Sequence, residues 1–126
     1  MDATTRTILW CCGAVNALFA LFHLLLFLVI TRLPGLEPGV RALLMAFNVG
    51  GTLMILFLAL AFLACPRELS TRLGRLSVLL GMLVYLTRAV GEVVFFPHPS
   101  RAILVVCVVT GLLHLVAFRR ATPRNA

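Results

Sequence analysis

Charged residues are scarce in this sequence, and lysine is absent from it. Only 12% of the 126 residues are charged, whereas 62% are hydrophobic, and the mean hydropathy is +1.11. Soluble domains contain about 25% charged and about 45–50% apolar residues. A chain this short has too little interior to bury so much apolar surface, which excludes a soluble enzyme or binding domain. Since disorder requires low hydrophobicity and high charge, the composition predicts a protein of the lipid bilayer.

Motifs for catalysis and metal binding are also missing. The four cysteines form no CxxC pair and no Cys/His metal spacing, so we interpret them as small apolar side chains. They are Cys11, Cys12, Cys65 and Cys107. Glu92 is the only acidic residue inside an apolar stretch, which excludes catalysis by paired carboxylates. Without a phosphate-binding, dinucleotide-binding or zinc-protease motif, the sequence predicts no catalytic residue, no metal site and no cofactor.

All eleven basic residues are arginines, and the formal net charge is +7. Nucleic-acid-binding proteins can have such a charge, but they gather basic residues on one face together with stacking aromatic side chains. Here every arginine except Arg88 lies in a connector, in a tail or near the end of an apolar stretch. This distribution is typical of membrane proteins, and we expect no nucleic-acid partner.

Four apolar stretches cover residues 8–30, 40–64, 73–96 and 101–118. The first three reach the roughly 20 residues that a helix needs to cross the bilayer, and the fourth has about 17 apolar residues. The first stretch is too long for a signal peptide and has no cleavage site after it. Short connectors make successive helices antiparallel neighbours. The sequence predicts an all-α integral membrane protein with one domain, residues 1–126, that forms a four-transmembrane-helix, up-down-up-down bundle.

The arginines are distributed unequally between the two sides of the predicted bundle. Seven lie at the N-terminus, around the second connector and in the C-terminal tail, whereas three lie on the opposite side. Because arginine is enriched in cytoplasmic segments, we expect both termini to be cytoplasmic (N-in, C-in). The expected location is a bacterial-type inner or plasma membrane.

The third stretch has one small and polar face. Its residues recur at helical spacing, and they are Gly74, Ser77, Gly81, Tyr85, Arg88 and Glu92. Arg88 and Glu92 are four residues apart, so they can pair along the helix. Because an unpaired arginine inside a membrane span is costly, we expect this pair to form. Ionisable residues within a span generally indicate function.

Polar residues of different stretches fall into two layers when their depth is counted at about 1.5 Å per residue. The outer layer is the predicted ligand-binding site, and it contains Arg88, Glu92, His23, Asn48 and Tyr85. The inner layer is a secondary polar group, and it contains Asn16, Ser77, Thr110 and His114. Polar residues also join membrane helices without any further role. This packing role is the alternative for both layers.

The outer layer leads to a functional hypothesis. The protein would be a small polytopic membrane protein that binds or transports a small polar or anionic ligand, or a lipid headgroup. Arg88 would bind the anionic group and Glu92 would position Arg88. His23 would donate or relay a proton, and Asn48 and Tyr85 would orient the ligand.

Two other functions stay open. A chain with so few residues outside its spans is typical of an accessory or assembly subunit of a larger membrane complex, and a homo-oligomer is the alternative assembly. The third hypothesis is a membrane-embedded enzyme or a haem-binding electron carrier. His23 and His114 differ by roughly 13 Å in expected depth, which is too far for one haem. Cys107 enters the outer half of the fourth stretch, where it could act as a nucleophile with His23 and Glu92.

Overall fold

The protein consists of long helices joined by short connectors. The computed structural model describes residues 2–121, and within this range it contains four long helices and one short 3-10 helix. They are α1 (Ala3–Arg32), α2 (Pro38–Ala64), the 3-10 helix η1 (Glu68–Ser70), α3 (Arg72–Phe95) and α4 (Arg101–Arg120). Each of the four long helices is long and apolar enough to cross a membrane. This confirms the prediction of an all-helical chain with four membrane-length helices.

Each long helix begins at a side chain that accepts hydrogen bonds from N–H groups of the first turn. The capping residues are Asp2, Glu37, Thr71 and Ser100. At α2, the two carboxylate oxygens of Glu37 accept the N–H groups of Gly39 and Val40, each at 2.9 Å. Such side chains satisfy N–H groups that have no partner within the helix.

Arg41 closes the connector between α1 and α2. Its guanidinium donates to the carbonyls of Ile30, Thr31 and Leu33 at 2.5, 2.9 and 2.6 Å. Carbonyls at the end of a helix lack intrahelical partners, so this contact satisfies them and joins α1 to α2. Within the connector, Gly35 has a φ of 74°, a left-handed conformation that glycine adopts without steric cost.

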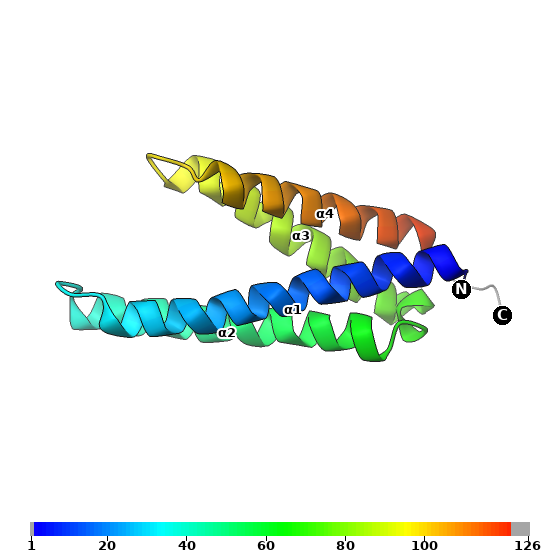
Figure 1. The fold of residues 1–126 in the computed structure, drawn as a ribbon, viewed down its shortest axis with the longest axis horizontal. Coiled ribbons are helices and arrows are strands. Elements are labelled where there is room, and N and C mark those ends of the chain that lie inside the picture. Colours follow the sequence, from blue (N-terminus) through cyan, green and yellow to red (C-terminus); the bar gives the residue numbers. More distant parts are fainter. Residues whose placement is uncertain (1, 122–126) are drawn as a thin grey trace.

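The four long helices form two hairpins, α1–α2 and α3–α4 (Figure 1). The hairpins meet where α1 begins, α4 ends and residues 65–71 connect α2 to α3; we call this the terminal end. They diverge toward the opposite end, which carries the connectors 33–37 and 96–100 and which we call the distal end (Figure 1). Contacts between the hairpins are made mainly by α1 and α4, with a few between α2 and α3.

The buried apolar core lies where the hairpins meet. Its larger cluster draws on all four long helices and η1, and it contains Leu9, Cys12, Leu58, Phe62, Leu69, Val78 and Ala117. A smaller cluster of Tyr85, Ala89 and Cys107 lies between α3 and α4, and Phe19 of α1 packs against it. Many large apolar side chains elsewhere on the helices are exposed. Apolar surface on this scale is what a protein in contact with lipid presents.

Candidate functional site

Three buried polar side chains from three helices meet at the junction of the hairpins. The Oδ1 atom of Asn16 on α1 accepts a hydrogen bond from the Tyr85 hydroxyl on α3 at 2.8 Å. Its Nδ2 atom lies 3.2 Å from Nε2 of His114 on α4, and it also donates to the Cys12 carbonyl at 2.8 Å. All three side chains are fully or almost fully buried. One amide therefore holds α1 against both helices of the second hairpin.

The hydrogen bonds of His114 decide which of its nitrogens carries the proton. Nδ1 lies 2.8 Å from the Thr110 carbonyl, and because a carbonyl can only accept, Nδ1 is the donor. Nε2 then accepts from Asn16. Every side-chain N–H and O–H group of Asn16, Tyr85 and His114 thus has a partner inside the protein. A network closed in this way is typical of helix packing rather than of ligand binding.

The imidazole ring of His114 lies directly against the backbone of α3 at Gly81. A Cβ atom at position 81 would lie 2.4 Å from Cδ2 and 2.7 Å from Nε2 of His114. Phe62 of α2 and Tyr85 pack on the same ring, with centroid distances of 5.2 and 5.4 Å. Since Asn16 comes from α1, the four long helices converge on this one side chain.

A second polar pair lies within the first hairpin. Nδ1 of His23 on α1 is 3.0 Å from Oδ1 of Asn48 on α2. The Asn48 amide donates to the backbone carbonyl of His23 at 2.9 Å. This reciprocal contact joins α1 to α2, and it explains why Asn48 is buried in an otherwise apolar helix.

The third polar group is the ion pair of Arg88 and Glu92 on α3. Nη1 of Arg88 lies 2.6 Å from one carboxylate oxygen of Glu92. The other oxygen accepts the N–H of Ser100 at 2.7 Å, where α4 begins. The side chain of Glu92 is 4% exposed, whereas that of Arg88 is 42% exposed. Glu92 therefore joins the two helices of the second hairpin, and one side of Arg88 stays open.

The guanidinium of Arg88 has donors that the protein does not use. A guanidinium carries five N–H groups. Among the contacts of residues 2–121, only Nη1 meets an acceptor, the carboxylate of Glu92. The Cζ atom also lies 5.4 Å from the centroid of the Phe96 ring, a cation–π distance. N–H groups in or near a membrane need acceptors, so the remaining donors are open to water, a lipid or another ligand from outside the chain.

The structure divides the five residues of the predicted outer site among these three places. Tyr85 belongs to the junction, His23 and Asn48 pair inside the first hairpin, and Arg88 and Glu92 pair inside the second. Similar depth does not bring them together, because the hairpins diverge toward the distal end (Figure 1). Within the described part of the chain the five side chains do not form one site. Ligand binding at Arg88 stays a prediction.

The predicted inner layer is more compact. Asn16 and His114 are in contact, and the backbone carbonyl of Thr110 completes their network. The Thr110 hydroxyl itself donates to Val106 within α4. Ser77 is half-buried, and among residues 2–121 it makes no side-chain hydrogen bond to this network. Tyr85 is assigned to the outer layer by its depth, but its hydroxyl donates to Asn16. Tyr85 therefore joins this network, and Ser77 does not.

Two residues that organise the distal end were not predicted. The sequence indicates Arg41 only as one of the charges that set the topology, yet its guanidinium binds three carbonyls at the end of α1. Its position near the start of a helix, after a short connector, was an available signal. Ser100 holds Glu92 through its backbone N–H, and a backbone donor leaves no signal in the sequence.

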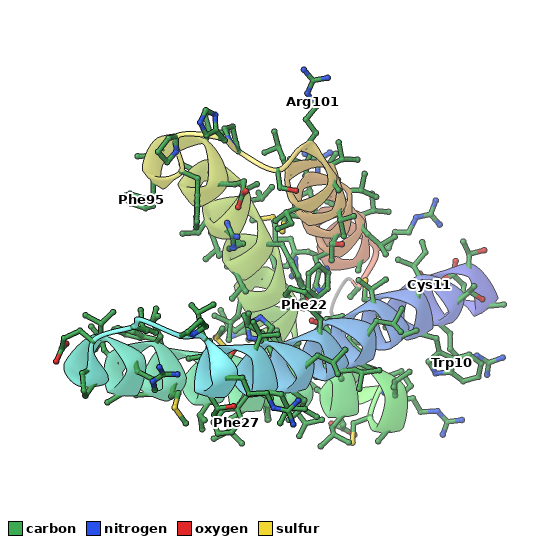
Figure 2. All side chains as sticks on the ribbon, turned by 60° about the vertical axis from the view of Figure 1, so that its left-hand side comes forward. Trp10, Cys11, Phe22, Phe27, Phe95 and Arg101 are labelled. Carbon is green, nitrogen blue, oxygen red and sulfur yellow. The ribbon has the colours of Figure 1, made fainter. Side chains whose placement is uncertain are left out.

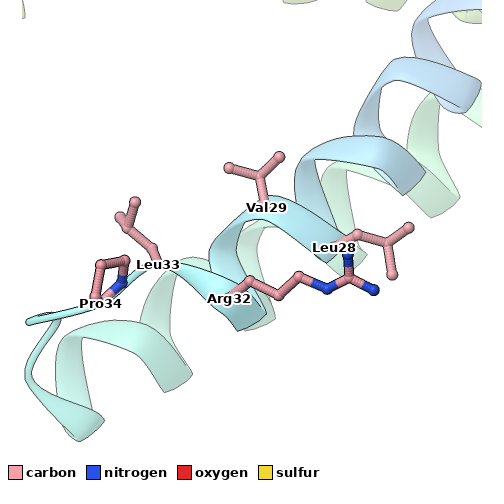
Figure 3. Close-up of a pocket in the computed structure, with 5 residues that line it drawn as sticks. All are labelled: Leu28, Val29, Arg32, Leu33 and Pro34. Atoms are coloured by element: carbon pink, nitrogen blue, oxygen red, sulfur yellow. The ribbon is translucent and has the colours of Figure 1, made fainter.

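A shallow depression lies at the distal end of α1. Its lining residues are Leu28, Val29, Arg32, Leu33 and Pro34 (Figure 3). All five come from one short segment, and Arg32 is the one charged side chain among them. This depression is a surface feature of a helix end rather than an enclosed binding site.

Comparisons with protein families, with curated proteins and with solved structures find no match to this chain. Within residues 2–121, no group of three or more His, Cys, Asp or Glu side chains is placed to hold a metal ion. Any function must therefore be inferred from the side chains themselves. Of the three interhelical polar groups described above, the pair of Arg88 and Glu92 is the one with unused donors and an open side.

Proposed function

We propose that this protein is a small polytopic membrane protein that binds an anionic group at Arg88. The observation that carries the proposal is that the Arg88 guanidinium is only partly paired and is open on one side. It is paired with Glu92 through one nitrogen, the Arg88 side chain is 42% exposed, and the other donors find no acceptor among the described residues. Phosphates and carboxylates match the planar fork of donors that an arginine presents. Such a ligand would supply the acceptors that the protein lacks.

Glu92 prepares Arg88 for this role. Its carboxylate is buried and is held from the other side by the N–H of Ser100. The guanidinium is thereby oriented before a ligand arrives, which lowers the entropic cost of binding. Glu92 also balances the charge of Arg88 when no ligand is bound.

We also propose that the helices cross the membrane alternately, as an up-down-up-down bundle with both termini in the cytoplasm of a bacterial-type cell. The arginines support this orientation. Those at the terminal end are Arg6, Arg67, Arg72, Arg75, Arg119 and Arg120, and those at the distal end, apart from Arg88, are Arg32, Arg41 and Arg101. Arg124, counted with the first group in the sequence, lies outside the described residues. The positive-inside rule places the more basic end in the cytoplasm.

The test of anion binding compares melting temperatures of the purified full chain in a neutral detergent. The probes are sodium phosphate and dihexanoyl phosphatidic acid, with sodium chloride of equal ionic strength as the reference. We expect at least one probe to raise the melting temperature of the wild type and of Arg101→Gln but not of Arg88→Gln. Arg101 is a matched control because it is exposed and points away from the molecule (Figure 2). Stabilisation by neither probe, or equal stabilisation of all three proteins, would overturn the proposal.

A further inference from the structure

We infer that the anionic group bound at Arg88 is the phosphate of an anionic phospholipid, whose acyl chains pack on exposed aromatic side chains near the distal end. This inference rests on the proposed function and adds the class of the ligand. The ligand would reach the guanidinium sideways from the bilayer. Three features of the structure support an amphiphile over a soluble anion.

The first feature is the direction of the Arg88 side chain. It contacts Glu92 one turn away and Phe96 two turns away, both toward the distal end. Eight residues of helix span about 12 Å, but the Cζ atom of Arg88 is only 5.4 Å from the centroid of the Phe96 ring. Because Phe96 directly follows α3, the charge lies near the end of the helix. This is the level of lipid headgroups, which arginines in a span commonly reach.

The second feature is the apolar surface around this charge. Phe95 and Phe96 are 79% and 50% exposed. A soluble anion gains nothing from such surface, whereas acyl chains cover it favourably. A cation next to exposed aromatic rings therefore suits a molecule with a charged head and apolar tails.

The third feature is the open side of the site. Tyr85, one turn before Arg88 on the same side of α3, packs on Phe19 of α1 with a centroid distance of 5.0 Å. Beyond this contact the hairpins separate toward the distal end (Figure 1). Because the side chain of Arg88 is 42% exposed there, a lipid can approach it without displacing a helix.

Charge distinguishes between phospholipids at this position. A choline headgroup would bring a second positive charge close to Arg88, and the two like charges would repel. A glycerol headgroup brings hydroxyl groups and no charge. We therefore expect phosphatidylglycerol to bind in preference to phosphatidylcholine.

The first experiment measures lipids retained by the full chain in native mass spectrometry. The protein is incubated in detergent with equal amounts of phosphatidylglycerol and phosphatidylcholine that carry identical acyl chains. We expect about a tenfold preference for phosphatidylglycerol in the wild type and in Arg101→Gln, because the choline charge repels Arg88 and the glycerol headgroup does not. Arg88→Gln should retain both lipids equally. A preference that survives in Arg88→Gln, or that is absent from the wild type, contradicts the inference.

The second experiment keeps Arg88 and so does not depend on the folding of an Arg88 variant. In a Trp10→Phe background, Phe96→Trp places a single tryptophan next to the guanidinium. Phe47→Trp, on the exposed surface of α2, is the control. In phosphatidylcholine vesicles, a small fraction of brominated phosphatidylglycerol should quench the Phe96→Trp protein more than brominated phosphatidylcholine does. The Phe47→Trp protein should be quenched equally by both, and equal quenching of Phe96→Trp would refute the inference.

The experiments distinguish failure of anion binding at Arg88 from failure of the phospholipid assignment. If inorganic phosphate stabilises the protein through Arg88 but neither lipid experiment shows a preference, anion binding stands and the lipid is wrong. If Arg88→Gln changes neither the stabilisation by phosphate nor the retention of any lipid, both proposals are wrong.

Discussion

Asn16 is the residue on which the junction of the hairpins most depends. Its single amide serves Tyr85, His114 and the Cys12 carbonyl. A hydrogen bond between membrane helices contributes only about 0.6 kcal/mol on average. Leaving a buried partner unpaired costs more, about 1–3 kcal/mol. The network therefore matters less for total stability than for specifying which helices meet, because separation of these helices would leave the buried groups without their partners.

The contact of His114 with Gly81 gives a prediction with an internal control. Gly81→Ala forces the ring to move, because the added Cβ would lie 2.4 Å from Cδ2 of His114. We expect a loss of about 1–3 kcal/mol in the free energy of unfolding, as overpacked cores show. Gly50→Ala adds a Cβ with no atom within 4 Å, so it should leave stability unchanged or slightly raised. Unfolding by sodium dodecyl sulfate in mixed micelles measures both, and equal stability of the two variants would show that the ring is misplaced.

At the scale of elements, the helix ends are fixed by short polar contacts. Glu37 caps the first turn of α2, and Arg41 of α2 binds carbonyls at the end of α1. Two charged side chains therefore hold the two sides of the connector between these helices. The pKa of Glu37 is lowered below its ordinary value, because the N–H groups of Gly39 and Val40 donate to its carboxylate. A charged capping group makes the hairpin sensitive to acid.

The sign of this acid sensitivity follows from the lowered pKa. The capping contribution is complete above the pKa of glutamate in the unfolded chain, and it is lost as the pH falls through the lower pKa of the folded protein. We expect the amide resonances of Gly39 and Val40 to titrate with a midpoint below the ordinary pKa of glutamate. In Glu37→Gln the same resonances should not titrate in this range. A midpoint at or above the ordinary value would show that the cap is absent.

The polar face of α3 illustrates how one pattern can serve two purposes. Toward the terminal end, Gly81 and Tyr85 pack against α1 and α4. Toward the distal end, Arg88 and Glu92 pair with each other, and Glu92 alone reaches α4. The change occurs where the hairpins begin to separate, so tertiary contact decides which polar residues are enclosed.

At the scale of the whole molecule, the proposed topology can be tested with a native thiol. Cys65 is an exposed free cysteine in the connector at the terminal end. With Cys11 replaced by alanine, a membrane-impermeant maleimide should label Cys65 in inverted membrane vesicles but not in intact spheroplasts. His98→Cys, in a chain that also carries Cys65→Ala, should show the opposite pattern. Labelling of both positions from the same side would exclude the up-down-up-down arrangement.

The helices were predictable from the sequence, whereas the polar groups were predictable only where the contact is local within one helix. Arg88 and Glu92 were found because their contact is local, four residues apart in one helix. The partner of Tyr85 was not found, because depth along a helix gives one coordinate and says nothing of rotation or of neighbouring helices. Asn16 and Tyr85 are 69 residues apart in the chain, and no local pattern connects them.

The sequence by itself determined that this protein suits the lipid bilayer and that it consists of long helices. Its apolar stretches are long enough for helices that span a bilayer, and in lipid a helix satisfies its own backbone. Its few charged residues already singled out Arg88 and Glu92. Only the tertiary structure decided that the helices form two diverging hairpins, that Asn16, Tyr85 and His114 close the junction, and that Arg88 keeps unused donors. The reason is physical: burial and hydrogen-bond satisfaction depend on which helices touch, and those contacts join residues far apart in the chain.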